Sequence, residues 1–184
     1  MKLFEEQTFE KINQLECAEY ESCTFKNCNF SNFNFSNYVF RDCVFQSCEL
    51  GLLVLENTVM NHITFKDSNL IGIKLHQCKD FLLAFRFENC SLKLASFYRM
   101  KIKKTAFKNC KMQEVDFTEA DISEAVFDFC DLERAVFDNS NLEKSDFRTA
   151  YNYTINPLNN RMKKARFSRD GLEGLLVGFD IIVE

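Results

Sequence analysis

The chain has 184 residues, 46% of them apolar, and a formal net charge of −4. This length supports one domain with a continuous core, and no run approaches the roughly 18 apolar residues of a membrane-spanning helix. The composition is rich in Phe (21) and Cys (9), with a single Pro and no Trp. Such a bias indicates a structural slot that repeats along the chain and selects Phe.

The first segment, residues 1–14, is polar with Phe4, Phe9 and Ile12 interspersed, and we expect it to cap the N-terminal end of the core. It contains no apolar stretch of the kind found in signal peptides, which favours a cytoplasmic location. Nine cysteines are an odd number in such a chain, so reduced thiols are expected in place of a disulfide framework.

The central segment has a period of five. An apolar residue occupies every fifth position from Leu15 to Leu75, and the register resumes two residues late, from Leu82 to Phe147. Neither an α-helix nor a flat strand has this period. A smaller residue, mostly Cys, Ala or Ser, precedes most of these apolar residues by two positions.

This unit closely resembles that of the pentapeptide-repeat family, for example in AsnCysAsnPhe at 27–30, AlaAspIle at 120–122 and SerAsnLeu at 140–142. The resemblance implies an all-β fold, a right-handed quadrilateral β-helix of about seven coils over residues 15–152, with four units in each coil. Residues twenty apart should then stack. With a small bulge at 76–81, one predicted core column contains only phenylalanine: Phe25, Phe45, Phe65, Phe87, Phe107, Phe127 and Phe147. The same register places seven cysteines on inward positions: Cys23, Cys28, Cys43, Cys48, Cys90, Cys110 and Cys130.

The last segment, residues 153–184, is expected to form a C-terminal cap. It begins with an irregular stretch around Pro157, and the spacing of its leucines predicts a short α-helix at about 171–179, with Ser168 or Asp170 as N-cap. Its resemblance to the ending of Qnr-type, gyrase-binding members implies a homodimer contact through Leu172, Leu175, Leu176, Phe179, Ile181 and Ile182. A helix that only caps its own coil is the alternative.

Charge is banded along the chain. Residues 91–111 contain seven basic residues and no acid, whereas residues 112–147 have a net charge of −9. The acidic band reaches the local charge density of duplex DNA, which carries one charge per roughly 1.7 Å. We therefore take as candidate partner-binding residues Asp116, Asp121, Glu124, Asp128, Asp131, Glu133, Asp138 and Glu143. The alternative is a solvated surface whose acids neutralise the neighbouring basic coil.

Catalytic and cofactor motifs are not found. His62 and His76 occupy outward positions of different repeats, and the glycines match no phosphate-binding loop. Metal binding by pairs such as Cys23 and Cys28 is less favoured than burial of these thiols. The sequence therefore predicts a protein that is not an enzyme, has no cofactor, and contacts neither nucleic acid nor membrane.

The resemblance to Qnr-type and microcin-immunity proteins implies a partial DNA mimic that binds DNA gyrase or topoisomerase IV and protects or modulates it. One departure concerns loops, because Qnr proteins of the protective type carry projecting loops and this chain has only the short interruption from His76 to Phe81. Two other hypotheses stay open: a structural or regulatory scaffold with an unrelated partner, and a thiol or metal sensor.

Overall fold

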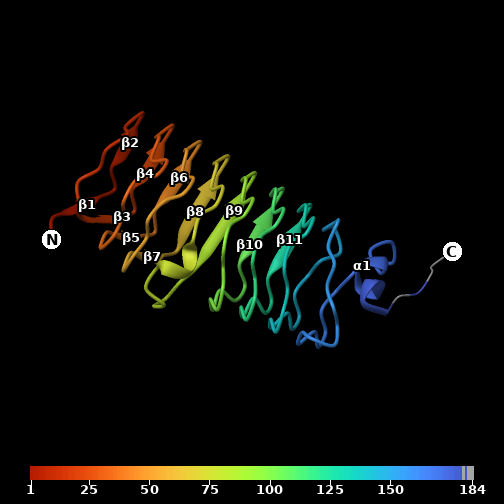
Figure 1. Cartoon of the computed structure of the whole chain (residues 1–184). Helices are drawn as coiled ribbons and strands as arrows, with labels where there is room; N and C mark the ends of the chain where they lie inside the picture. Colours follow the sequence, from red (N-terminus) through yellow and green to blue (C-terminus); the bar gives the residue numbers. More distant parts are fainter. Residues whose placement is uncertain (180, 182–184) are drawn as a thin grey trace.

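The computed structural model describes residues 1–179 and 181, and shows a rod of stacked coils (Figure 1). Two parallel sheets run along it. The first contains β1 (Leu3–Glu5), β3 (Glu19–Glu21), β5 (Val39–Arg41) and β7 (Val59–Asn61). The second contains β2 (Thr8–Glu10), β4 (Thr24–Lys26), β6 (Val44–Gln46), β8 (Ile63–Lys66), β9 (Phe85–Glu88), β10 (Ala106–Lys108) and β11 (Val126–Asp128).

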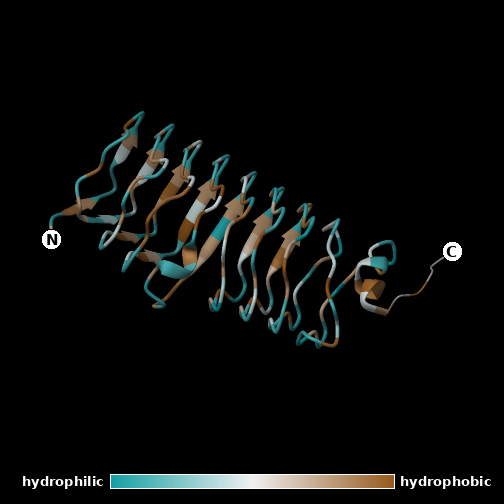
Figure 2. Cartoon of the chain, viewed as in Figure 1, coloured by the Kyte–Doolittle hydropathy of each residue, from teal (hydrophilic) through white to brown (hydrophobic). Residues whose placement is uncertain are grey.

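Each five-residue unit forms one side of a four-sided coil. We number the sides 1 to 4 in chain order by their buried central residues, for example Tyr20, Phe25, Phe30 and Phe35. Within a sheet, paired residues are twenty apart, as in Phe45 and Phe65. This register confirms the predicted fold class, and Figure 2 shows hydrophobic colour recurring along the strands of successive coils.

The phenylalanine column of side 2 is a continuous run of stacked aromatic rings through the core. All seven predicted members are buried, and neighbouring rings stack with centroids 4.6–5.5 Å apart. Phe9 and Phe167 extend the column at its two ends, with centroid distances of 5.1 and 5.2 Å. The stacking therefore runs from the first strands to the C-terminal cap.

The smaller inward residue of each unit also bonds to the backbone. Cys43 donates its Sγ–H to the carbonyl of Tyr20 at 3.4 Å, and Ser145 donates its hydroxyl to Ile122 at 2.8 Å. In both cases the acceptor lies 23 residues earlier, in the preceding coil. A small side chain fits this position, and a thiol or hydroxyl can remain buried there because its donor is satisfied.

The corners of the coil need a left-handed backbone. Non-glycine residues with φ between 49° and 68° recur every five residues along most of the rod. This conformation is costly for most L-residues, and Asn and Asp tolerate it best. Many corners accordingly carry Asn, such as Asn27, Asn32 and Asn37.

The interruption near residue 80 differs from the prediction at one position. Phe65 pairs with Phe87, 22 residues away, so the two-residue slip is present, and the 3-10 helix η1 (Leu75–Gln77) lies at its start. However, Leu82, which we placed in the core, is 64% exposed, whereas Phe85 is only 6% exposed. The prediction for Leu82 was wrong because the period alone does not determine where the extra residues leave the core.

Both ends of the rod are paired beyond the boundaries that the sequence suggested. Strand β1 pairs with β3, and β2 with β4, so residues 1–14 lie against the first full coil and share its sheets. At the other end, Asn141 bridges to Arg161 and Asp146 to Arg166.

The C-terminal cap is a short helical segment, α1 (Glu173–Leu176) followed by the 3-10 helix η2 (Val177–Phe179). It packs closely on Tyr153: a Cβ atom at Gly174 would lie 2.2 Å from the Tyr153 carbonyl oxygen, so only glycine fits there. Ile155 donates its N–H to the Gly174 carbonyl at 2.9 Å. The prediction of Ser168 or Asp170 as N-cap was wrong, because α1 begins after Leu172, which makes no side-chain capping bond. Ser168 instead accepts the N–H of Gly171 at 3.1 Å, in the turn before the helix.

The stacked column predicts a steep dependence of stability on ring volume at Phe107, which is fully buried between Phe87 and Phe127. Phe107→Ala should lower the free energy of unfolding by about 3–5 kcal/mol, and Phe107→Leu by about 1.5 kcal/mol. Urea unfolding followed by circular dichroism measures both. The control Phe129→Ala removes a 60% exposed ring and should change stability by less than about 0.5 kcal/mol. Equal losses at Phe107 and Phe129 would contradict the role of the column.

Candidate partner-binding surface

The eight candidate acidic residues are distributed over all four sides of the rod. Successive units turn the chain by one side, so their places follow from the register. Side 1 carries Asp121, Glu124 and Glu143, side 2 carries Asp128, side 3 carries Asp131 and Glu133, and side 4 carries Asp116 and Asp138. The structure therefore does not bring all eight to one surface.

Three of these residues have a structural role in their own turns. Asp116, Asp121 and Asp131 each immediately precede a buried central residue. In each, Oδ1 accepts the backbone N–H two residues later, at 2.9, 3.2 and 3.3 Å respectively. Asn29 and Asn34 make the same bond to Ser31 and Ser36 in the first coils. Asn and Asp at this position thus serve the turn.

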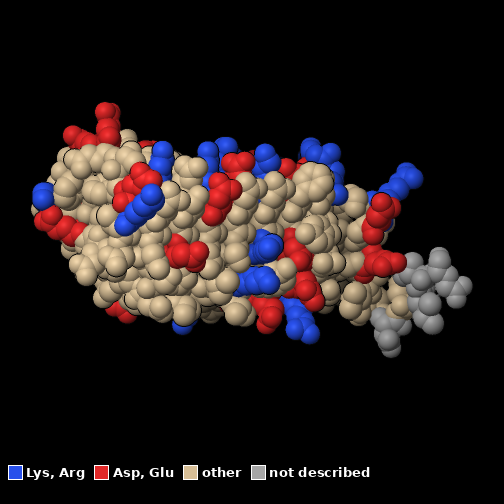
Figure 3. Space-filling view, turned by 90° about the horizontal axis from the view of Figure 1, so that it is seen from above, with Lys and Arg blue, Asp and Glu red and all other residues tan. Residues whose placement is uncertain are grey.

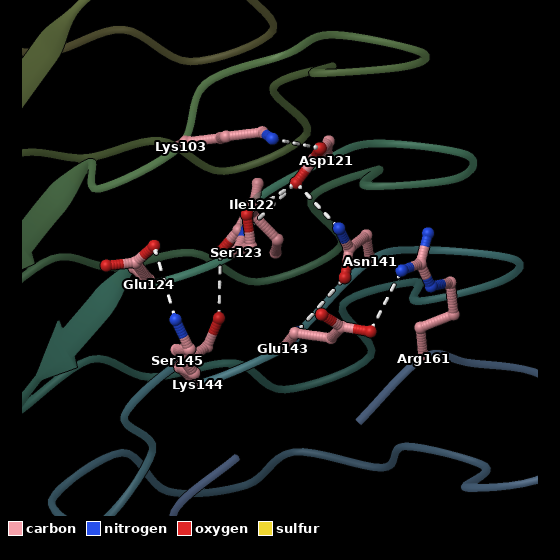
Figure 4. Close-up of polar contacts among 10 residues, drawn as sticks. All are labelled: Lys103, Asp121, Ile122, Ser123, Glu124, Asn141, Glu143, Lys144, Ser145 and Arg161. Carbon is pink, nitrogen blue, oxygen red and sulfur yellow. Dashed lines mark hydrogen bonds and ion pairs between the residues drawn. The ribbon is translucent and has the colours of Figure 1, made fainter. Parts of the chain in front are cut away.

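The acids of side 1 are neutralised by cations of adjacent coils (Figure 4). Asp121 lies 3.2 Å from Lys103, Glu124 lies 4.0 Å from Lys144, and Glu143 lies 2.9 Å from Arg161. Partial burial opposes ionisation of Asp121, but the hydrogen bonds from Ser123 and the ammonium group of Lys103 outweigh it and lower the pKa of the carboxyl group. Side 1 consequently presents a chain of ion pairs along the rod.

The candidate acids of sides 3 and 4 form no ion pair in the described part of the chain, although Glu119 on side 4 pairs with Arg99 at 2.8 Å. Among the described residues, no basic nitrogen lies within 4.0 Å of Asp116, Asp131, Glu133 or Asp138. Glu114 lies at the corner between them, tied to Glu133 by a backbone hydrogen bond of 2.9 Å. These five carboxylates cover two successive coils, and we call them the acidic corner. Figure 3 shows, for one face of the rod, red and blue groups interspersed with uncharged surface.

The predicted dimer residues are partly exposed. Leu172, Phe179 and Ile181 are 46%, 46% and 56% exposed. Leu175 packs against the core, and Leu176 has intermediate exposure, while Ile182 lies outside the described residues. The cap therefore covers its own last coil with one face and leaves apolar side chains in solvent on the other.

Eight of the nine thiols are buried in the core. All cysteines but Cys17 are buried, and burial raises the pKa of Cys43 and Cys48 to about 12. A protonated, buried thiol is a poor nucleophile and a poor ligand. Within the described part of the chain, no group of three or more His, Cys, Asp or Glu side chains is placed to hold a metal ion. No described helix is long and apolar enough to cross a membrane.

Comparisons with solved structures find the same architecture in pentapeptide-repeat proteins. Two trypsin-treated variants of QnrB1, a plasmid-mediated fluoroquinolone resistance protein, align with TM-scores of 0.52 and 0.51 at 16% and 18% identity. In both cases the alignment covers 99% of this chain and 97% of the other. HetL from the cyanobacterium Nostoc, involved in regulating heterocyst differentiation, aligns over 92% of this chain and 90% of its own with 16% identity and a TM-score of 0.38.

At these identities the likeness concerns the fold. No curated protein sequence matches the chain. The family model for the pentapeptide repeat region matches residues 18–80 and 82–153, which is well over half of the sequence. The break between the two matches falls in the insertion where the coil register slips. This chain belongs to the pentapeptide-repeat family, whose solenoid fold is generally non-enzymatic.

Proposed function

We propose that this protein acts by binding DNA gyrase or topoisomerase IV as a partial DNA mimic, and that it protects or modulates that enzyme. The observation that carries the proposal is the acidic corner, whose four carboxylates on the flat sides have no ion-pair partner in the described structure. The full-length likeness to QnrB1, a fluoroquinolone resistance protein, supports the choice of enzyme.

The charge density of the acidic corner suits a DNA-binding groove. Two coils at an interstrand spacing of about 4.8 Å occupy about 10 Å of the rod, a length over which duplex DNA carries about six charges. The acidic corner offers five carboxylates, and Arg134 at the same corner offsets one. A positively charged groove attracts such a surface at long range, and the attraction falls with salt.

The exposed apolar residues of the cap would join two rods. A homodimer formed through Leu172, Phe179 and Ile181 would place two acidic corners on opposite sides of its centre. This arrangement would offer a longer acidic surface than one rod provides. The dimer is part of the proposal, and sedimentation of a Leu172→Asp variant as a monomer would support it.

A scaffold with an unrelated protein partner is the second candidate. It is favoured by an exposed apolar ridge on the corner between sides 3 and 4, where Leu52, Ile71 and Leu94 are 58%, 37% and 56% exposed. Leu52 and Leu94 also hold left-handed φ angles of 55° and 58°. An apolar surface of this kind is typical of protein–protein contacts.

The first experiment separates these candidates. Gyrase supercoiling is measured with and without the protein, each in the presence and absence of a quinolone. We expect the protein either to reduce supercoiling alone or to restore it in the presence of the drug. Supercoiling that is unchanged at micromolar protein under both conditions would favour the scaffold.

A matched pair of variants locates the binding surface. Asp131→Asn/Glu133→Gln/Asp138→Asn removes three unpaired charges from sides 3 and 4, whereas Asp121→Asn/Glu124→Gln/Glu143→Gln removes three paired charges from side 1. If the acidic corner binds the enzyme, the first variant should weaken binding at least tenfold. The second variant should have a smaller effect, although the change in net charge is the same. Equal affinities of the two variants would rule out the acidic corner as the site.

The hydrogen bond between Asp121 and the N–H of Ser123 predicts different losses of stability for two substitutions of Asp121. Asp121→Asn keeps the acceptor for the N–H of Ser123 but loses the attraction to Lys103, whose side chain is 57% exposed, so it should cost less than about 1 kcal/mol. Asp121→Ala also leaves the N–H of Ser123 without its acceptor, which should cost about 1–2 kcal/mol more. Urea unfolding measures both losses. A loss for Asp121→Asn as large as that for Asp121→Ala would contradict the turn role.

The pH dependence of the Asp121→Asn effect has a defined sign. The pKa of Asp121 is lowered in the folded protein from its usual value of 3.8. Ionised Asp121 therefore stabilises the fold above that value, and this contribution disappears as the pH falls through the folded pKa. The difference in unfolding free energy between wild type and Asp121→Asn should vanish on acidification. A difference that stays constant through this range would show that Asp121 does not act through its charge.

A further inference from the structure

The insertion on side 1 exposes two adjacent apolar side chains. Phe81 and Leu82 are each 64% exposed, and Leu82 has a left-handed φ of 51°, which a bulky residue rarely adopts. Single exposed apolar residues are common on protein surfaces. An adjacent exposed aromatic and aliphatic pair is different, because it forms a larger apolar surface than a single exposed corner residue such as Leu52 or Leu94.

The insertion lies next to the most basic part of side 1. Lys79 donates its N–H to the Thr58 carbonyl at 2.9 Å, and Leu83 bridges to Asn61, so this segment follows β7. In the next coil, side 1 is formed by residues 100–104. Figure 1 shows the insertion, in yellow and yellow-green, standing out from the row of coils. The apolar pair therefore lies on a segment that leaves the regular coil, and both side chains are exposed.

Lysines lie within the insertion and on side 1 of the following coil. Residues 79–84 and 100–104 together contain four lysines, Lys79, Lys101, Lys103 and Lys104, and one carboxylate, Asp80. All four lysines are exposed. Lys103 pairs with Asp121, whereas Lys79, Lys101 and Lys104 have no carboxylate within 4.0 Å among the residues that the structure describes. Within the described structure, the apolar tip thus has three lysines without an ion-pair partner in its own segment and in the following coil, and one carboxylate, Asp80, beside it.

We propose that side 1 docks on an anionic lipid bilayer, with Phe81 and Leu82 inserted among the headgroups and the lysines bound to lipid phosphates. Two exposed apolar side chains beside unpaired lysines suit an anionic bilayer, whose interface accepts apolar groups and whose phosphates attract ammonium groups. Lysines near an anionic leaflet add attraction that salt weakens. This contact needs only two apolar side chains and no membrane-spanning segment.

The charge distribution around the rod fits this orientation. Side 3 is opposite side 1 in a four-sided coil, so the carboxylates of Asp131 and Glu133 point away from the bilayer when side 1 faces it. The neighbouring side 2 adds another exposed cation, Arg86, on the coil of the insertion. Side 1 itself carries Asp121, Glu124 and Glu143, each of which lies within 4.0 Å of a cation. Repulsion from the unpaired carboxylates of side 3 is therefore small in this pose. The proposal does not depend on binding to a topoisomerase.

The absence of tryptophan from the chain gives a direct test. Phe81→Trp places a single indole at the tip, and its emission is followed with phosphatidylcholine vesicles that contain or lack phosphatidylglycerol. We expect a blue shift, and quenching by brominated acyl chains, only with phosphatidylglycerol. The control is Phe129→Trp, at a residue that is also exposed (60%) and left-handed (φ 50°) but lies on the acidic band. A shift of equal size in both variants, or none in either, overturns the proposal.

Sedimentation of the full-length chain with the same vesicles measures partitioning without the indole. Phe81→Ser/Leu82→Ser should abolish sedimentation with anionic vesicles, and Phe129→Ser should leave it unchanged. Lys101→Gln should lower the partition coefficient about fivefold, more than Lys26→Gln, which removes the same charge from another coil. Equal effects of the two lysine variants would contradict a specific docking side. Binding to duplex DNA in place of vesicles, with the same dependence on Phe81 and Leu82, would overturn the lipid assignment in favour of nucleic acid.

Discussion

Stacking of inward side chains at the spacing of adjacent coils is the constraint on which the whole rod depends. Each coil alone encloses only two residues per side and cannot form a core, so its stability comes from the coils above and below it. The rings of side 2, with centroids 4.6–5.5 Å apart from Phe25 to Phe147, show how closely successive coils must follow one another. A change in coil length is tolerated only where the extra residues leave the core, as at Leu82.

Because of the same constraint, outward side chains at equivalent positions of successive coils also lie next to one another in columns along the rod. Because Asp121, Asn141 and Arg161 follow one another on side 1 at bridged positions, a charge introduced in one coil always meets the side chains of the next. This explains why side 1 neutralises itself: Lys103 precedes Asp121, and Arg161 follows Glu143. On side 3, Lys111 occupies the bridged position before Asp131, but no basic nitrogen of the described residues lies within 4.0 Å of Asp131 or Asp138. The surface properties of the rod are therefore set by pairs of residues about twenty apart.

The sequence predicts those parts of the structure that obey the period and misses those that depart from it. Phe25 to Phe147 could be assigned to one column because twenty-residue spacing is visible in the sequence, and the buried cysteines followed from the same register. Phe9 was missed because it pairs with Phe25 across only sixteen residues. Leu82 was expected in the core and Phe85 was not, whereas the structure buries Phe85 and exposes Leu82. The period could not decide between them, because an insertion can leave the core at several places without changing the later register. Beyond residue 152, Arg161 and Arg166 continue the bridges, and Ala165 before Arg166 repeats the small residue of the unit.

The acidic band shows a different limit. Its net charge was correct, but a sum over residues 112–147 ignores the side on which each carboxylate lies. The register could have separated Asp121 from Asp131 in advance, because two units turn the chain by half a coil. What the register could not supply is the role of Asp116 and Asp131 in accepting backbone N–H groups, since only geometry distinguishes a turn acceptor from a free charge.

A rigid rod with distinct sides can hold two contacts at once. The acidic corner and the Phe81–Leu82 tip belong to different sides and to nearby coils. The acidic corner is polar and negatively charged, whereas the tip is apolar and lies near lysines. A partner that binds one of them need not displace a partner from the other, because the packed core between them keeps their spacing and direction fixed. In a four-sided solenoid, the number of five-residue units between two residues determines whether they lie on the same side, and therefore whether they can act on the same partner.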